Sequence, residues 1–115
     1  MKVYLAKDIT DIPMYGDVPD LTQGDTTIVD SFEISDDLSR FVDAQFVDQT
    51  NAVCDASLDF GDYQYYNVAQ CRLLLEWLDG ELANGSKSVL CDFFIKLKDY
   101  LNYAIDRNTG VAIEL

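Results

Sequence analysis

The hydrophobic positions in the second half of the chain predict two helices joined by a short turn. From residue 68 to residue 82, apolar side chains recur every three or four residues, which places them on one face of an α-helix. Asn67 and Gln70 match the Asn-x-x-Gln capping pattern at the start of this helix, and Asn84-Gly85 ends it. A second stripe ends near Thr109-Gly110 and comprises Leu90, Phe94, Leu97, Leu101 and Ile105. We therefore expect an αα-hairpin.

Alternating apolar positions predict strands at both ends of the chain and two more between them. Residues 2–6 and residues 111–115 alternate over short stretches, as half-buried strands do. Residues 26–34 are rich in β-branched side chains and predict a third strand, and the alternation over residues 51–60 predicts a fourth. Ser35, followed by two aspartates, is a typical helix N-cap and predicts a helix over residues 36–48.

Strands at both ends with helices between them predict an α+β fold. We expect a small β-sheet with the helix hairpin packed on one face, in a single compact domain over residues 1–115. A chain of 115 residues that is 49% hydrophobic can bury a core of its own. Two prolines and two glycines punctuate residues 8–25, which we expect to form a long connection.

The charge of the chain is strongly negative and unevenly distributed. Twenty-one acidic against eight basic residues leave a formal net charge of -13, and residues 1–66 hold fourteen of the acids with three of the bases. Without a basic surface, neither direct binding to nucleic acid nor binding to an anionic membrane is expected. The charge favours a basic protein as the partner.

The residue types available for chemistry are few. The chain has no histidine, the commonest general base and metal ligand, so we expect no enzyme, no cofactor and no metal site. Cys54, Cys71 and Cys91 form no C-x-x-C pair and are expected to be reduced, buried thiols. Reduced cysteines and the lack of a signal segment predict a cytoplasmic protein. The lack of any apolar run near 18 residues predicts that it has no membrane span.

The segment 59–66 interleaves carboxylates with aromatic rings and is the best candidate for a partner-binding site. Tyrosine gives a large contact area for little lost rotamer entropy, and neighbouring carboxylates pair with Arg or Lys of a basic partner. The residues expected to contact the partner are Asp55, Asp59, Asp62, Tyr63, Tyr65 and Tyr66.

Each of these features has an alternative interpretation. Tyr65 and Tyr66, and to a lesser degree Tyr63, also suit a core position with the hydroxyl at the surface. The three aspartates also suit a hard cation, although their spacing does not match a calcium-binding EF-hand loop. Trp77 lies off the main apolar stripe of its helix, so it is either an exposed anchor or packs on a neighbouring element.

Three functional hypotheses follow from this combination of size, charge and aromatic residues. The first is a non-enzymatic inhibitor that blocks a basic protein surface; in size and composition the chain is similar to the small acidic immunity proteins that neutralise bacterial nuclease toxins. The second is an anti-CRISPR protein or another phage-encoded nucleic-acid mimic, with acids in an extended row. The third is a structural or regulatory protein whose acidity has no dedicated basic partner.

Overall fold

The computed structural model places four strands in one antiparallel sheet. β1 (Lys2–Ala6) lies between β4 (Val29–Glu33) and β6 (Val111–Glu114), and β5 (Tyr63–Tyr66) completes the order β4–β1–β6–β5. The structure describes residues 1–10, 12–16, 18–23, 27–34, 46–54, 56, 63–83 and 91–114. The two strands nearest the chain ends are therefore the central ones, and both are buried on both faces.

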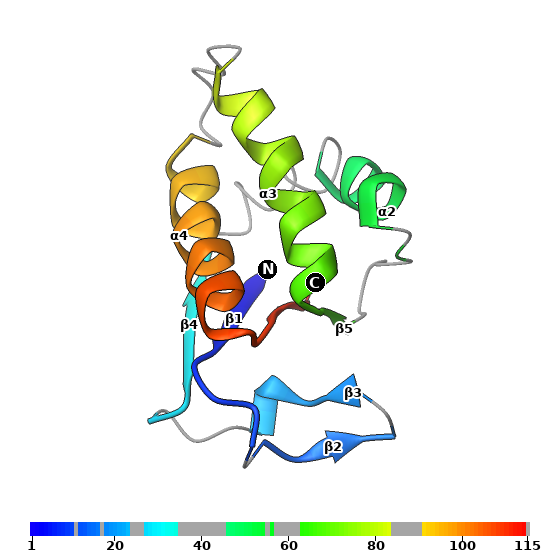
Figure 1. The fold of residues 1–115 in the computed structure, drawn as a ribbon, viewed down its shortest axis with the longest axis vertical. Helices are drawn as coiled ribbons and strands as arrows, with labels where there is room; N and C mark the ends of the chain where they lie inside the picture. Colours follow the sequence, from blue (N-terminus) through cyan, green and yellow to red (C-terminus); the bar gives the residue numbers. More distant parts are fainter. Residues whose placement is uncertain are drawn as a thin grey trace.

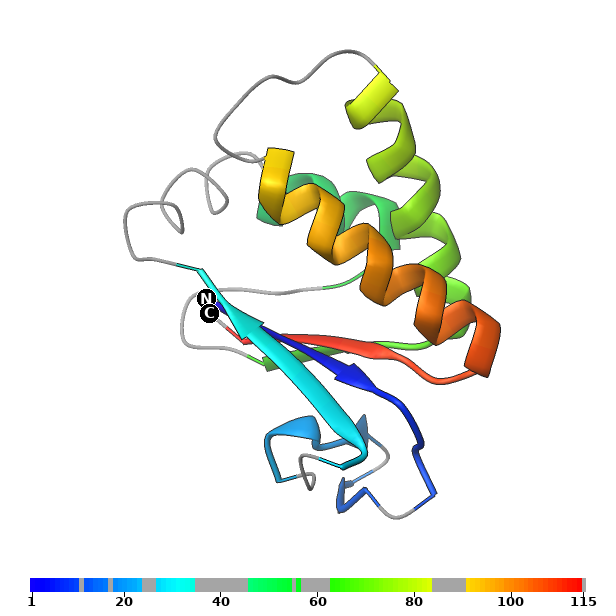
Figure 2. The ribbon, with the colours of Figure 1, turned by 90° about the vertical axis from the view of Figure 1, so that its left-hand side faces the viewer.

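Helices cover one face of this sheet, as the sequence predicts. α3 (Val68–Ala83) and α4 (Cys91–Arg107) lie side by side over it, and α2 (Asp48–Cys54) packs against α3 (Figures 1 and 2). The main core fills the space between helices and sheet. Its largest fully buried side chains include Tyr66, Phe46, Phe93, Leu74, Leu78, Leu97, Leu101 and Ile113. The expectation of an α+β fold with a helix hairpin on one face is confirmed.

The predicted capping box at the start of α3 is present. The backbone N–H of Gln70 donates to Oδ1 of Asn67, and the backbone N–H of Asn67 donates to Oε1 of Gln70, each over 3.0 Å. These bonds satisfy two of the donors that a helix start leaves without an intrahelical partner. They also fix where β5 ends and the helix begins.

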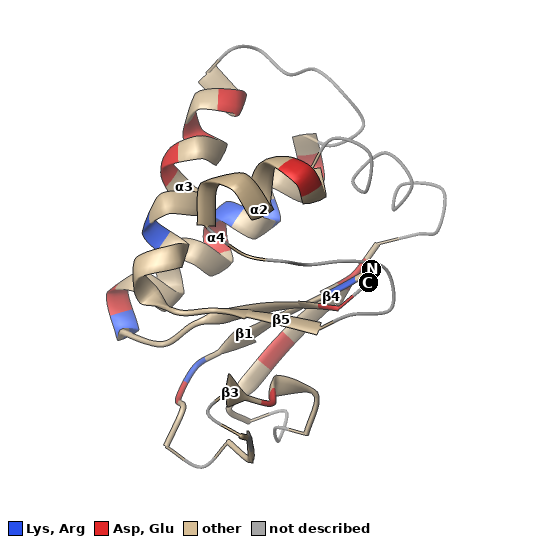
Figure 3. Ribbon diagram, turned by 90° about the vertical axis from the view of Figure 1, so that its right-hand side faces the viewer, with Lys and Arg blue, Asp and Glu red and all other residues tan. Residues whose placement is uncertain are grey.

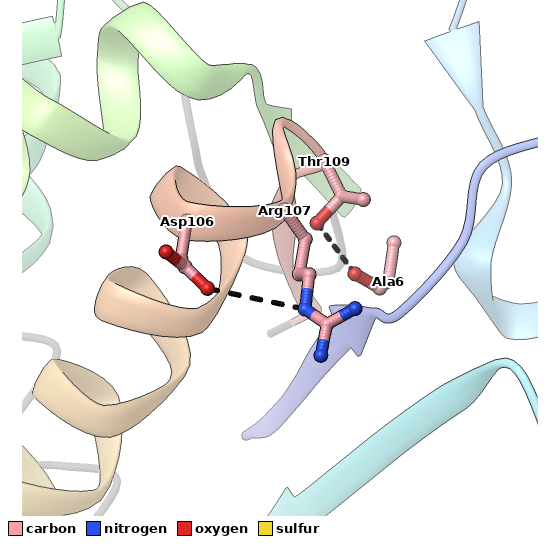
Figure 4. A network of polar contacts seen from close by, with 4 residues as sticks. All are labelled: Ala6, Asp106, Arg107 and Thr109. Atoms are coloured by element: carbon pink, nitrogen blue, oxygen red, sulfur yellow. Dashed lines mark hydrogen bonds and ion pairs between the residues drawn. The ribbon is translucent and has the colours of Figure 1, made fainter.

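The end of α4 is fixed by a left-handed residue and by a bond to β1. Asn108 has φ 57°, and the N–H groups of Asn108 and Thr109 donate to the carbonyls of Ile105 (3.4 Å) and Ala104 (2.9 Å). This is the Schellman arrangement of a helix C-terminus. The buried hydroxyl of Thr109 then donates to the carbonyl of Ala6 over 2.6 Å (Figure 4). The helix end is thus joined directly to the central strand.

The opposite face of the sheet is covered by part of the segment expected to be a long connection. β2 (Met14–Tyr15) and β3 (Val18–Pro19) form a short hairpin, and a 3₁₀-helix η1 (Leu21–Gln23) follows (Figures 1 and 2). A second, smaller core lies between this layer and the sheet and contains Tyr4, Ala6, Ile12, Leu21, Val29 and Ala112. The sheet is therefore the middle of three layers.

Two predictions of secondary structure need correction or completion. The strand predicted over residues 51–60 is wrong for residues 51–54, because residues 48–54 form α2, whose buried positions Thr50 and Cys54 follow Val47 at helical spacing. Residues 55 and 57–60 of this prediction lie outside the described residues. The strand β5 was not predicted at all. The strand predicted over residues 26–34 is present as β4, and most of the helix predicted over residues 36–48 lies outside the described residues.

No helix in the described part of the chain has the length and apolar character needed to cross a membrane.

Candidate functional site

The register of β5 separates the tyrosines of the predicted site onto two faces of the sheet. Tyr63 and Tyr65 pair with Glu114 and Ala112 and face the hairpin layer, where both pack against the smaller core. Tyr66 faces the helices and is completely buried, so its ring cannot contact a partner and belongs to the core. The other three predicted contact residues, Asp55, Asp59 and Asp62, lie outside the described residues.

Tyr63 joins the sheet to β3 and η1. Its hydroxyl accepts a hydrogen bond from the backbone N–H of Leu21 (2.9 Å) and donates one to the carbonyl of Pro19 (2.8 Å). Burial raises the pKa of Tyr63 well above its ordinary value, so the hydroxyl keeps its proton for this donation. Tyr63 therefore has a structural role that the sequence did not indicate.

Tyr63 also lines a cavity of about 350 Å³. We call it the acidic pocket; it is lined by Val18, Asp20, Thr22, Tyr63 and Glu114. Its walls come from three separate parts of the chain, namely residues 18–22 of β3 and η1, Tyr63 of β5 and Glu114 of β6. Glu33, Lys2, Glu114 and Tyr63 are register partners in one row across the four strands, so the pocket lies at one end of the sheet.

Negative charge gathers around this end of the sheet. The hydroxyl of Tyr4 donates to Oε1 of Glu114 over 3.0 Å. Burial, this hydrogen bond and the charges of Glu114, Asp20 and Glu33 together raise the pKa of Tyr4 to about 12. Three carboxylates thus act on a single phenol. The field at the pocket opposes a further negative charge and favours a cation.

The carboxylate of Asp20 is held in a fixed orientation at the pocket wall. Its Oδ1 accepts hydrogen bonds from the backbone N–H of Thr22 (3.1 Å) and from the Thr22 hydroxyl (2.5 Å). Its own backbone N–H donates to the carbonyl of Pro13 over 2.9 Å. A carboxylate that is already ordered loses less entropy when it binds a cationic group. Neither Asp20 nor Glu114 was singled out from the sequence, since no local pattern links these two positions.

Lys2 is the basic residue of the sheet that lies beside the carboxylates of Glu33 and Glu114 in the register. Lys2 lies opposite both Glu33 and Glu114 in the register, and its Nζ lies 5.2 Å from the centroid of the Tyr4 ring. No ion pair within 4.0 Å joins Lys2 to either glutamate in the described part of the chain. The carboxylates at the pocket therefore keep capacity for an external cation.

The cysteines behave as small buried side chains at two of three positions. Cys54 and Cys71 are buried, and burial raises their pKa values to about 11 and about 12. Cys91 is half-buried, and all three are free thiols. Raised pKa values suppress the thiolate, so Cys54 and Cys71 are poor nucleophiles near neutral pH.

Within the described ranges, no three cysteine, aspartate or glutamate side chains come together in a group able to hold a metal ion.

Comparison with protein-family models, with curated proteins and with solved structures finds no match to this chain.

Proposed function

We propose that the protein is a non-enzymatic inhibitor that binds and blocks a basic surface of another protein, as an immunity protein that neutralises a bacterial nuclease toxin. The observation that carries this proposal is the acidic pocket, a single cavity that Asp20, Glu114 and Tyr63 line together. The net charge of -13 supports it, because it steers a basic partner toward the molecule.

The pocket has the chemistry to receive an Arg or Lys side chain of that partner. Carboxylates form the strongest hydrogen bonds with guanidinium and ammonium groups, and the ring of Tyr63 and the side chain of Val18 can cover the aliphatic stem. A nuclease binds substrate phosphates through such basic side chains. An inhibitor that pairs with them occupies the site that the phosphates would use.

The experiment compares wild-type protein with two variants that lose the same charge. Glu114→Gln changes the pocket and keeps an oxygen to accept the bond from Tyr4. Asp99→Asn changes an exposed acid on α4 and serves as the control. Each protein is immobilised, incubated with bacterial lysate and washed at low salt and at about 0.5 M salt, where the Debye length is well below 10 Å. Bound proteins are identified by mass spectrometry, and the nuclease activity of each is measured with and without the inhibitor.

We expect wild-type protein and Asp99→Asn to retain one basic nuclease at high salt and to suppress its activity. Glu114→Gln should bind this nuclease about tenfold more weakly, which corresponds to a loss of about 1.4 kcal/mol of binding free energy. A scatter of basic proteins that all wash off, or a captured nuclease that stays active, would contradict the proposal. Capture of a nucleic-acid-guided effector would instead favour a nucleic-acid mimic.

A further inference from the structure

A second, short apolar stripe of α3, formed by Leu73 and Trp77, lies beside the face that packs into the main core. The buried positions of this helix are Cys71, Leu74 and Leu78. Leu73 and Trp77 lie one turn apart on another face, and Leu73 is 45% exposed. A helix with apolar side chains on two faces has more apolar surface than its own fold buries.

This stripe forms one wall of a groove between α3 and α2. The groove has a volume of about 410 Å³, and we call it the Trp77 groove; its lining in the described part of the chain comprises Val53, Leu73, Glu76, Trp77, Gly80 and Glu81. The five residues from α3 recur at helical spacing, so the groove follows the helix axis. A groove along a helix has the shape that receives another helix.

Trp77 is held firmly from one side. The centroid of its ring lies 5.9 Å from that of Phe46 and 6.0 Å from that of Phe94, in tilted and edge-to-face arrangements. The ring therefore packs on neighbouring elements, as one of the two interpretations from the sequence has it, and it is half-buried rather than exposed while it also lines the groove. A rigid, half-buried tryptophan is the side chain most often found at the centre of a protein interface.

Gly80 lies in the last turn of α3, where no contact within the protein requires a glycine. A Cβ at this position would meet no atom within 4 Å, and its backbone has an ordinary helical conformation. Glycine inside a helix costs about 1 kcal/mol relative to alanine. The missing side chain leaves the floor of the groove open, which allows the backbone of a second helix to approach closely.

Carboxylates at the rim indicate the charge of the occupant. Glu76 and Glu81 line the groove, and neither forms an ion pair with a described residue. Asp79, between them in the sequence, is bound instead to Lys98 on α4 over 2.8 Å. Figure 3 shows the side of the molecule on which α2 and α3 face the viewer, and several acidic positions, in red, lie along α3. The rim is therefore complementary to lysine and arginine.

We infer that the Trp77 groove docks an amphipathic, basic α-helix of a partner protein. An apolar side chain of that helix packs against Trp77 and Leu73, and its Lys or Arg side chains pair with Glu76 and Glu81. A second copy of this chain is a poor occupant, because two molecules of net charge -13 repel each other. Figure 2 shows the helices and the β2–β3 hairpin on opposite sides of the sheet. The Trp77 groove is lined from α2 and α3, and the acidic pocket in part from β3 and η1, so this surface goes beyond the proposed function.

The test uses a synthetic peptide of roughly 18 residues, about five helical turns, with leucines every three or four positions and lysines elsewhere. Trp77 is the single tryptophan of the chain, so its fluorescence reports on the groove directly. We expect saturable binding with a shift of the emission to shorter wavelength, because the peptide displaces water from the ring. A peptide with the same leucines and glutamates in place of the lysines should not bind.

Four variants distinguish groove binding from general attraction to an acidic protein. Gly80→Leu fills the groove and should weaken binding at least about tenfold. Glu76→Gln with Glu81→Gln should weaken it and flatten its salt dependence. Asp92→Asn with Asp99→Asn, which removes the same charge from exposed positions on α4, should stay within about twofold of wild type. Glu114→Gln should leave peptide binding unchanged, so failure here and failure of the proposed function are separable.

Equal affinity of wild type and Gly80→Leu would overturn the inference, as would binding that leaves the Trp77 emission unmoved. Sedimentation of the protein alone provides the remaining check, with a monomer expected. A dimer that Gly80→Leu dissociates would instead assign the groove to self-association.

Discussion

The hydroxyl of Tyr63 accepts a hydrogen bond of 2.9 Å from the backbone N–H of Leu21, a residue 42 positions earlier in the chain. The same hydroxyl donates to the carbonyl of Pro19 over 2.8 Å. One side chain of an edge strand therefore holds the 3₁₀-helix and the hairpin against the sheet. Because Asp20 and Thr22 lie in that layer, this contact also positions two walls of the acidic pocket.

Tyr63→Phe should destabilise the protein by about 1–3 kcal/mol, since it leaves the N–H of Leu21 and the carbonyl of Pro19 without their partner. Urea unfolding measures the change, and the amide of Leu21 should exchange faster with solvent. Tyr103→Phe is the control, because the Tyr103 hydroxyl has no hydrogen bond to any described residue, and it should stay within about 0.5 kcal/mol of wild type. Equal stability of the two variants would show that the Tyr63 contact does not hold the β2–β3 hairpin and η1 against the sheet.

Tyr66→Phe should have the opposite outcome. The hydroxyl of Tyr66 is fully buried and has no hydrogen-bond partner among the described residues. A buried hydroxyl without a partner is unfavourable by about 1–3 kcal/mol, so its removal should leave the free energy of unfolding unchanged or raise it. The same urea experiment decides this. A loss of more than about 1 kcal/mol would mean that the hydroxyl does have a partner.

Gly80 is exposed and Gly110 is buried. Substitution of each by alanine should change the stability in opposite directions. Gly80→Ala should stabilise the protein by about 0.5–1 kcal/mol, because helix propensity improves and nothing obstructs the new methyl group. At Gly110 a Cβ would overlap the phenol of Tyr65 and lie 2.6 Å from the carbonyl of Tyr66, so Gly110→Ala should destabilise by about 3 kcal/mol. Thermal melting of both variants checks the sign of each effect. Similar melting temperatures would be inconsistent with the packing at Gly110.

The elements that the sequence predicts well are those whose evidence is local. Asn67 and Gln70 are three residues apart, so their mutual capping is visible from spacing alone, and both hydrogen bonds are present in the structure. The central strands at the chain ends and the stripes of α3 and α4 likewise depend on neighbours within a few positions.

The elements that it does not predict depend on contacts between distant segments. β5 reads Tyr-Gln-Tyr-Tyr, without alternation, because tyrosines face both the helices and the hairpin. In α2, Ala52 and Cys54 fall two positions apart, as in a strand, and a helix of seven residues is too short for its own period to stand out. The acidic pocket joins Asp20, Tyr63 and Glu114, which only the strand register and the hairpin bring together.

Alkaline pH should destabilise the protein through its buried thiols and phenols. Burial raises the pKa of Cys71 to about 12 and that of Cys54 to about 11, from an ordinary value of 9.0, and it also raises the pKa of Tyr66. The unfolded chain loses these protons first as the pH rises. The stability is therefore complete below about pH 9 and falls as the pH climbs toward the folded-state values.

Urea unfolding between pH 7 and about pH 11 measures this loss, and Cys71→Ala identifies one of the groups responsible. The variant should be less stable at neutral pH by about 1–2 kcal/mol, because it loses a buried side chain in the main core. Its decline above pH 9 should be shallower than that of wild type, since one ionisation is missing. Leu74 is a buried neighbour on α3 that does not ionise. Leu74→Ala should therefore lower the stability relative to wild type by an amount that does not change with pH. A decline of equal slope in all three proteins would exclude Cys71 as a source of the pH dependence.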